Sequence, residues 1–178
     1  MTLRERIEDL KGIEAPSVHH PESNQWFHTM QVTLHALDEL RPETSPTTES
    51  ATIIMAAALH DIGKAIVFPL QGDTKKHEGV SADLVRAAVG SNIVRPENTA
   101  YGMVWWEDVI WLIENHLRIM WYLDGQMTHS KGRELSNHVL FKPLCQLRRF
   151  DIKGRDPNFL LTWRNIARFE KVLDNLGL

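Results

Sequence analysis

The feature that most constrains this sequence is a run of apolar residues that ends in an ionisable pair. Residues 51–59 read Ala-Thr-Ile-Ile-Met-Ala-Ala-Ala-Leu, and His60 and Asp61 follow directly. A helix that is apolar on nearly every side belongs in the interior of a protein. The ionisable pair at its end is then interior too, where a charge without a partner is costly. The sequence therefore predicts a central buried helix over 51–61 whose end carries a compensated polar site.

The spacing of apolar residues predicts helices along most of the chain. Apolar side chains recur every three or four positions, as the buried face of a helix requires. Besides the central helix, we expect helices over residues 3–10, 25–41, 77–88, 103–120, 135–150 and 159–176. Stretches rich in glycine, proline and small polar residues predict loops over 11–24, 41–50, 67–76, 91–98 and 124–132. Neither strand alternation nor an internal repeat is evident, so we expect an all-α fold, a single helical bundle over residues 1–178.

The composition excludes several classes of protein. The chain has 178 residues, of which 43% are apolar and 24% are charged, so it is long enough and apolar enough to bury one hydrophobic core. This excludes a disordered tail and a disulfide-stapled mini-protein. Its one cysteine, Cys145, cannot form an internal disulfide, so we expect a reducing compartment and assign the cytoplasm. No signal peptide is evident, and apolar runs such as 53–59 are shorter than the roughly 20 residues of a membrane span. We therefore expect no membrane association.

The charge balance bears on the kind of substrate. The net charge is −3, from 20 basic and 23 acidic residues. Extensive contact with nucleic-acid phosphates normally recruits many lysines and arginines, so we expect no extended nucleic-acid footprint. Basic residues do cluster over 142–164, which indicates either a solvated helix face or a local phosphate-binding surface. Small or end-bound substrates fit this balance best.

Four histidines and two aspartates near predicted helix ends are candidate metal ligands. Imidazole nitrogen and carboxylate oxygen both bind first-row divalent metals. Singly, each residue is typical of a polar surface, and His60-Asp61 is equally consistent with a buried His–Asp hydrogen bond. Together they suffice for two metals bridged by Asp61, while a single metal needs only His28, His60, Asp61 and Asp151. The full set is His28, His60, Asp61, His77, His116 and Asp151.

The central helix also has expected boundaries. We expect Thr48 or Ser50 to cap its start. Gly63 permits an unusual backbone turn directly after the His60-Asp61 pair. Lys64 then either faces a substrate phosphate or is an ordinary solvated lysine.

Taken in order, these residues resemble the HD superfamily of metal-dependent phosphohydrolases, in its HDIG subgroup. The nearest resemblance is to the HD domain of bacterial CCA-adding tRNA nucleotidyltransferases, and it covers roughly residues 19–156, followed by a C-terminal helix over 159–176. The strings that carry it are His20-Pro21-Glu22, Trp26-Phe27-His28-Thr29-Met30, Ala57-Ala58-Leu59-His60-Asp61-Ile62-Gly63-Lys64, His77-Glu78-Gly79 and Phe150-Asp151-Ile152-Lys153-Gly154-Arg155.

The resemblance implies an enzyme with one or two divalent metal ions. It assigns His28, His60, Asp61 and Asp151 to the first ion, and Asp61, His77 and His116 to the second. Mixed nitrogen and oxygen ligands suit manganese, iron, cobalt, nickel or zinc, with magnesium a further candidate. Asp61, Lys64 and Arg155 are the expected catalytic residues. The two cations would neutralise the substrate phosphate, although Arg155 could instead brace Asp151.

The resemblance leaves the substrate open. Nothing upstream in the sequence could hold a polymerase carboxylate pair, so we expect the HD domain to stand alone. The first hypothesis is a phosphatase or 2′,3′-cyclic phosphodiesterase acting on nucleotides or RNA 3′ ends. A second is a nucleoside 5′-monophosphatase or a deoxynucleoside triphosphate triphosphohydrolase, and a third is a non-catalytic sensing or interaction module. The expected partner is thus a nucleotide or RNA-end phosphate, with a homo-oligomer as a further candidate.

The aromatic residues and remaining histidines complete the candidates. Three tryptophans share one predicted helix, which favours core or oligomer packing; these are Trp105, Trp106 and Trp111. Trp26 and Trp121 lie close in sequence to proposed ligands and are candidates for stacking on a nucleobase. His19 and His20 are candidates to flank the mouth of the site, whereas no role is expected for His35, His129 and His138.

Overall fold

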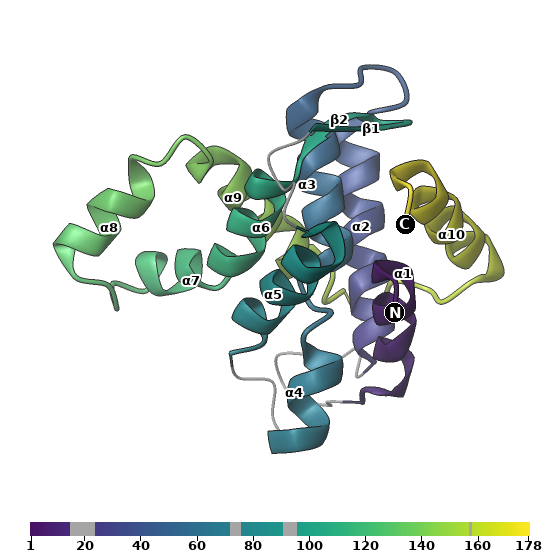
Figure 1. Ribbon diagram of the computed structural model, residues 1–178, viewed down its shortest axis with the longest axis horizontal. Helices are drawn as coiled ribbons and strands as arrows, with labels where there is room; N and C mark the ends of the chain where they lie inside the picture. Colours follow the sequence, from purple (N-terminus) through teal and green to yellow (C-terminus); the bar gives the residue numbers. More distant parts are fainter. Residues whose placement is uncertain (15–23, 72–75, 91–95, 157) are drawn as a thin grey trace.

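The computed structural model describes residues 1–14, 24–71, 76–90, 96–156 and 158–178, and helices dominate it (Figure 1). The fold class is all-α, as the sequence predicts, with one small two-stranded sheet. The elements are α1 Leu3–Asp9, the 3₁₀ turn η1 Leu10–Gly12, α2 Gln25–Leu40, α3 Thr48–Leu59, α4 Lys64–Gln71 and α5 His77–Val89. They continue with β1 Pro96–Thr99, β2 Gly102–Trp105, α6 Trp106–Asn115, α7 Arg118–Leu123, α8 His129–Ser136, α9 Phe141–Lys153 and α10 Trp163–Leu176.

Helix α3 is the centre of the molecule (Figure 1). Every residue from Ser50 to Leu59 is buried, and the helix packs against α2, α6 and α9. Burying one large aliphatic side chain contributes about 1.5–3 kcal/mol, so the packing of α3 against these three helices stabilises the bundle. The helix covers Thr48–Leu59 and not the expected 51–61, and its cap is Thr47 and not Thr48 or Ser50. The Thr47 hydroxyl accepts a hydrogen bond from the backbone N–H of Ser50 at 3.0 Å.

The same segment is long and apolar enough to cross a membrane by composition. Residues Thr48–Pro69 contain a window with a mean hydropathy of 1.6, but 83% of that window is buried inside the protein. The burial partners are the surrounding helices. The segment therefore belongs to the core of the bundle, with α3 as its first and most buried part.

Helix α2 lies beside α3 and brings polar side chains into the interior. Asn24 caps it by accepting a hydrogen bond from the backbone N–H of Phe27 at 3.1 Å. Its last turn ends at Arg41, which adopts a left-handed conformation with φ 46°. Gln25 and His28, one turn apart in its first half, are both fully buried. Buried polar groups require partners, so this part of α2 points to a polar site.

The largest difference from the predicted elements is a β-hairpin over 96–105. Strands β1 and β2 are antiparallel, with Pro96 opposite Trp105 and Thr99 opposite Gly102. The sequence suggested a loop followed by one helix over 103–120, but only α6 and the separate short α7 are helical there. Val104 is buried, and β2 packs against α3. Long-range packing on α3 thus decides the conformation of an apolar segment whose spacing alone is ambiguous.

Two more helices form where loops were expected. Helix α4 covers 64–71 with Pro69 inside it, and α8 covers 129–136. The helix expected over 135–150 is therefore wrong at its start, because α9 begins at Phe141 and ends at Lys153. The Thr128 hydroxyl accepts a hydrogen bond from the backbone N–H of Lys131 at 3.4 Å and so caps α8. Helix α8 carries few apolar residues, so its pattern is weak. Local capping and tertiary contacts, rather than periodicity, stabilise it.

Helix α10 closes the bundle beside α2 and brings the two ends of the chain together (Figure 1). It begins at Trp163 rather than near 159, after the cap Thr162. Its buried face packs into the core, and the ring of Phe169 meets that of Trp26 edge-on at 5.7 Å. Arg4 on α1 pairs with Glu170 and Asp174 on α10. Helices α1 and α10 therefore cover one side of α2. The helix ends that form the candidate site lie on its other side.

Candidate metal centre

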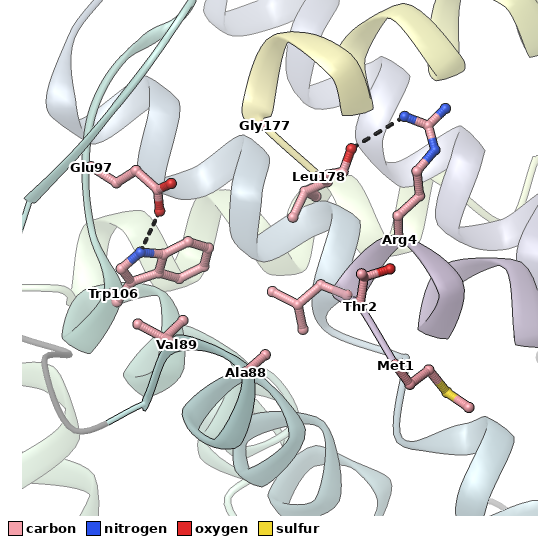
Figure 2. A pocket seen from close by; sticks show the side chains of 10 residues that line it. Met1, Thr2, Arg4, Ala88, Val89, Glu97, Trp106, Gly177 and Leu178 are labelled. Atoms are coloured by element: carbon pink, nitrogen blue, oxygen red, sulfur yellow. Dashed lines mark hydrogen bonds between the residues drawn. The ribbon is translucent and has the colours of Figure 1, made fainter.

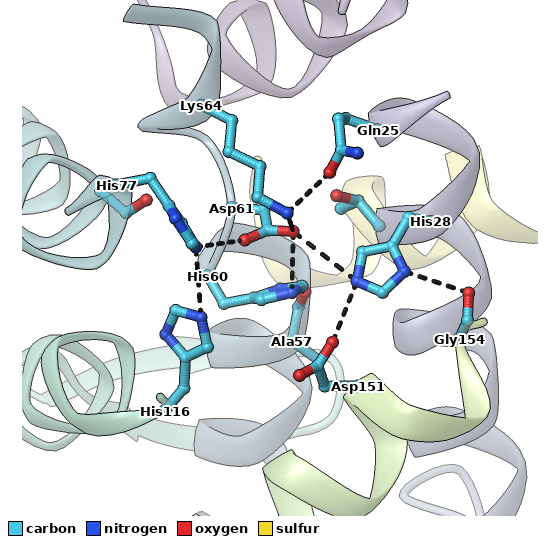
Figure 3. A network of polar contacts seen from close by, with 12 residues as sticks. Gln25, His28, Ala57, His60, Asp61, Lys64, His77, His116, Asp151 and Gly154 are labelled. Atoms are coloured by element: carbon cyan, nitrogen blue, oxygen red, sulfur yellow. Dashed lines mark hydrogen bonds and ion pairs between the residues drawn. The ribbon is translucent and has the colours of Figure 1, made fainter. Parts of the chain in front are cut away.

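Six side chains converge at one buried point between helix ends (Figure 3). His28 comes from α2, His77 is the first residue of α5, His116 follows α6, and Asp151 lies in the last turn of α9. His60 and Asp61 form the turn after α3. All six are buried, and the most exposed, His77, is only 5% exposed. The structure thus brings together residues that are up to 123 positions apart in the chain, counting from His28 to Asp151.

Asp61 lies at the middle of the cluster. Its Oδ2 is 3.2 Å from Nε2 of His60 and 3.6 Å from Nε2 of His28, while its Oδ1 is 2.9 Å from Nε2 of His77. The two carboxylate oxygens therefore face two different sets of histidines. That is the arrangement a carboxylate needs if it is to bridge two ions.

The remaining ligand candidates complete two groups. Nε2 of His28 is 3.1 Å from Oδ1 of Asp151, and Nε2 of His77 is 3.3 Å from Nε2 of His116. Two sets of three therefore have ligand atoms within 4.8 Å of one another: His28, His60 and Asp151, and Asp61, His77 and His116. An ion 2.0–2.2 Å from each ligand separates opposite ligand atoms by up to about 4.4 Å, which is close to this spread.

Backbone carbonyls determine the tautomer of three of the histidines. Nδ1 of His28 donates to the carbonyl of Gly154 at 3.0 Å, Nδ1 of His60 to Ala57 at 2.9 Å, and Nδ1 of His116 to Ile113 at 2.7 Å. A carbonyl can only accept, so each Nδ1 carries the proton. In the neutral ring the lone pair is then on Nε2, which points into the cluster, as in histidines that bind metals.

In this tautomer the lone pair on Nε2 of each histidine faces the lone pairs of other ligand atoms in the cluster. Nε2 of His60 is buried, faces a carboxylate oxygen at 3.2 Å, and makes no hydrogen bond among the described residues. Acceptors that face one another at such distances repel unless a proton or a cation lies between them. Divalent cations with nitrogen and oxygen ligands suit this donor set. The residues therefore fit a metal centre.

The charge states of Asp61, Asp151 and His116 also suit a metal centre. Burial raises the pKa of Asp61, but His60, Lys64 and His77 outweigh it and hold the pKa well below its usual range. Burial likewise raises the pKa of Asp151, and the neighbouring His28 and the charge of Arg155 lower it well below normal. Burial and the nearby His60 and His77 lower the pKa of His116 to about 3. At neutral pH both carboxylates are ionised and His116 is neutral, which are the forms that bind metal.

Lys64 is buried against Asp61 and is not solvated. Its ammonium group donates to Oδ2 of Asp61 and to Oε1 of Gln25, both at 2.7 Å, and the residue is only 3% exposed. Gln25 was not among the predicted site residues. Its position three residues before His28, on the same face of α2, is the sequence signal that could have identified it.

Two arginines hold Asp151. Nη1 of Arg148 bonds Oδ2 of Asp151, and Nη2 of Arg155 lies 3.3 Å from both carboxylate oxygens. Arg155 therefore braces Asp151, the second of the two roles considered for it. Arg148, one helical turn before Asp151 and almost fully buried, was not predicted.

Gly63 is needed for close packing, and its backbone is not unusual, contrary to the sequence prediction. Its φ is not positive, but a Cβ atom there would lie 2.4 Å from the carbonyl oxygen of His77 and 2.6 Å from the backbone nitrogen of Ser81. The backbone N–H of Gly63 donates to the Ser81 hydroxyl at 2.8 Å. Because Gly63 has no side chain, the turn after α3 can contact the start of α5. This contact positions His77 beside Asp61.

The other aromatic and histidine candidates lie elsewhere. Trp26 is buried in the core, so its ring is closed to a nucleobase, whereas Trp121 is 38% exposed. His138 stacks on Trp111 with ring centroids 3.8 Å apart. His35 packs against Phe159. His19 and His20 lie outside the described residues.

A separate pocket of about 840 Å³ lies beside the two ends of the chain (Figure 2). Its polar groups are paired with each other or with neighbours: the indole N–H of Trp106 donates to Glu97 at 2.7 Å, and Arg4 donates to the carbonyl of Leu178 at 3.2 Å. None of the six converging side chains lines this pocket. The metal centre is therefore the better candidate for chemistry.

The fold and the buried His/Asp cluster define a class of protein. Residues 26–141, more than half of the chain, match the HD domain family, so the chain belongs to that family. HD domains form a superfamily of metal-dependent hydrolases. The chain is also similar to the Multifunctional CCA protein of Haemophilus influenzae (strain PittGG), with 36% identity over 64 residues. That match covers 36% of this chain and only 15% of the relative.

Proposed function

We propose that this protein is a metal-dependent phosphoric ester hydrolase, a phosphatase or 2′,3′-cyclic phosphodiesterase that acts on nucleotides or RNA 3′ ends. The observation that carries the proposal is the convergence of six buried ligand side chains around Asp61, with the lone pairs of three histidines aimed inward. Membership of the HD domain family supports the reaction class. The similarity to a segment of a Multifunctional CCA protein agrees with the resemblance to the HD domain of CCA-adding tRNA nucleotidyltransferases, which suggests an RNA end as substrate.

The side chains divide into two sets of metal ligands that share Asp61. His28, His60, Asp61 and Asp151 would hold one divalent ion, and Asp61, His77 and His116 the other. Bound there, such ions lower the pKa of water to generate a nucleophile and neutralise phosphoryl oxygens. Manganese, iron, cobalt, nickel and zinc suit these ligands better than magnesium.

The neighbouring cations hold the ligands in position. Lys64 binds Oδ2 of Asp61 and is itself held by Gln25, so the carboxylate cannot rotate away from the histidines. Arg148 and Arg155 do the same for Asp151. Arg155 is only partly buried, so its guanidinium is also the cation best placed to meet a substrate phosphate. Lys64 is too enclosed for that role and acts through Asp61.

A substrate panel tests the proposal. Protein stripped of metal is reloaded with Mn²⁺, Co²⁺ or Ni²⁺ and incubated with a 2′,3′-cyclic nucleotide, a 3′-phosphorylated oligonucleotide, a nucleoside 5′-monophosphate and a deoxynucleoside triphosphate. We expect hydrolysis of one of the first two. Turnover confined to the monophosphate, or release of triphosphate, would replace this substrate class by the second hypothesis. No turnover with any metal would favour a non-catalytic module.

The matched substitutions are Asp61→Ala and Glu43→Ala, each of which removes one carboxylate. Asp61→Ala removes the central ligand and should lower turnover by at least about 100-fold, since it breaks both sets of ligands. Glu43 is exposed and forms no ion pair among the described residues, so Glu43→Ala should retain full activity. Equal activity in the two variants would refute the proposed site.

A further inference from the structure

Helices α7 and α8 form an arm, residues 118–136, that extends from the end of α6 away from the bundle (Figure 1). The arm has packing of its own. A Cβ atom on Gly132 of α8 would lie 3.2 Å from the ring of Tyr122 on α7, so only a residue as small as glycine allows this contact. The Tyr122 ring in turn meets Phe141, at the start of α9, edge-on at 5.8 Å. Aromatic packing thus gives the arm a defined shape.

A pocket of about 410 Å³ lies between the two helices of the arm. Its lining combines one exposed aromatic ring, two cations and small polar or flexible groups: Arg118, Trp121, Gln126, Met127, Thr128 and Lys131. The volume falls within the roughly 300–1,000 Å³ of typical small-molecule sites. Trp121 is 38% exposed, which is unusual for a large apolar side chain and leaves ring surface open to a ligand.

The cations of this pocket are not neutralised by the protein. Within the described part of the chain, neither Arg118 nor Lys131 forms an ion pair with a carboxylate. Elsewhere on the surface Arg4, Arg86 and Arg149 all do. Residues 118–142 carry four basic and two acidic side chains, although the whole chain has a net charge of −3. The arm therefore offers local positive charge for an anion.

An exposed indole that shares a pocket with two cations lacking an ion-pair partner among the described residues is suited to bind single-stranded nucleic acid. Base stacking on an aromatic ring contributes about 1–3 kcal/mol per base, and lysine or arginine binds the phosphate beside it. Small pockets for purely apolar ligands have no need of two cations, and an acidic peptide has no need of a flat ring. A nucleotide unit uses both features, because its base stacks on the aromatic ring and its phosphate binds the cations.

The arm pocket is also close to the metal centre along the chain. Arg118 follows His116 by two residues and donates to Oδ1 of Asn115 at 2.7 Å. Trp121 follows His116 by five residues, so their Cα atoms are at most about 18 Å apart. One short strand could therefore have a phosphate at the metal centre and a base at Trp121.

We propose that this pocket binds the end of a single-stranded nucleic acid, with a base stacked on Trp121 and a backbone phosphate between Arg118 and Lys131. This inference rests on the proposed function for its substrate. It narrows the preferred substrate to chains of at least two nucleotides, because a lone phosphate or cyclic nucleotide at the metal centre has no second unit to occupy the arm.

Binding without turnover provides the first test. A fluorescently labelled 3′-hydroxyl pentanucleotide, which has no terminal phosphate to lose, is titrated with the metal-loaded protein and followed by anisotropy. Trp121→Ala should raise Kd roughly 5- to 100-fold, and Trp121→Phe should recover most of the affinity. The matched control is Trp163→Ala, since Trp163 is 81% exposed but lies on α10. Equal Kd values for the Trp121 and Trp163 variants would overturn the inference.

Salt dependence tests the cations separately. The double variant Arg118→Gln and Lys131→Gln should reduce the slope of log K against log salt concentration by about 0.7, since the two cations share one phosphate and each phosphate neutralised on a single strand contributes about 0.7. An unchanged slope would overturn the assignment of phosphate to this pocket. Circular dichroism of each variant shows that the helices are retained.

Kinetics separate this inference from the proposed function. Trp121→Ala should lower kcat/KM for a 3′-phosphorylated pentanucleotide at least fivefold more than for p-nitrophenyl phosphate. Oligonucleotide binding that depends on Trp121 but is accompanied by no hydrolysis would contradict the proposed function and support the arm site. Hydrolysis of both substrates with equal losses in the variant would overturn the arm site alone.

Discussion

At the scale of single residues, the cluster is made of groups that hold one another in place. His28, His60 and His116 each give a proton to a backbone carbonyl and turn a lone pair inward. Lys64 and Arg155 hold the carboxylates of Asp61 and Asp151. The site therefore depends on neighbours that are not themselves candidate metal ligands, and we expect their removal to have measurable consequences.

Gln25 is the clearest of these supporting residues. Gln25→Ala removes one of the two acceptors of the buried Lys64 ammonium group, so we expect a loss of about 1–3 kcal/mol in the free energy of unfolding, measured by urea denaturation. Metal affinity, followed by calorimetric titration with Mn²⁺, should weaken as well. Asn137→Ala, at an exposed position, is the control and should stay within about 0.5 kcal/mol. A Gln25 variant that matches this control would contradict the role of Gln25.

At the scale of elements, the turn after α3 touches the start of α5, and two glycines test that contact. Gly63→Ala would place a Cβ atom 2.4 Å from the carbonyl oxygen of His77, so we expect a loss of about 1–3 kcal/mol or more in the free energy of unfolding. Gly79 lies in α5, where a Cβ atom would meet nothing within 4 Å. Gly79→Ala should therefore stabilise the protein by about 0.5–1 kcal/mol.

Urea denaturation of the two variants side by side checks this prediction. Both substitutions add one methyl group to the same part of the fold, so a difference between them isolates the contact between the turn and α5. A Gly63→Ala protein as stable as the wild type would show that the turn does not need this close approach. Weaker metal binding by Gly63→Ala would show in addition that the contact positions His77.

At the scale of the whole molecule, one cluster of candidate metal ligands joins α2, the α3–α4 turn, α5, α6 and α9 (Figure 3). Ions that bind only the folded state stabilise it by about 2.7 kcal/mol when their concentration is 100 times Kd. For a chain of this size each kcal/mol raises Tm by about 2–4 °C. Metal removal by a chelator should therefore lower Tm by roughly 5–10 °C.

Calorimetry with and without Mn²⁺ measures this shift. The sequence also predicts that residues 1–178 form one domain, so a single transition is expected in both conditions. Asp61→Ala should show no metal-dependent shift, because its central ligand is gone. A shift of the same size in that variant would mean that the stabilising ion binds elsewhere.

The sequence was sufficient for the all-α class and for the long helices of the core. Helices α2, α3 and α5 have strong local signals, namely apolar spacing, capping residues and terminal glycines, and these act over a few residues. The ordered His and Asp residues could likewise be selected as ligand candidates before any geometry was known. Their role as ligands stays a prediction, although the structure brings all six together.

Only the tertiary structure decided the features that depend on distant partners. The hairpin at 96–105 exists because β2 packs on α3, and α8 because of its cap and its contact with Tyr122. Gln25 joins the site because helix packing turns it toward Lys64. Arg148, in contrast, lies one turn before Asp151 on the same helix, so this spacing is a sequence signal that could have identified it. Local sequence encodes the tendency to form a helix and the chemical types of the side chains. Which side chains face one another is set by the packing of helices far apart in the chain, whose effect is not visible in any short window of residues.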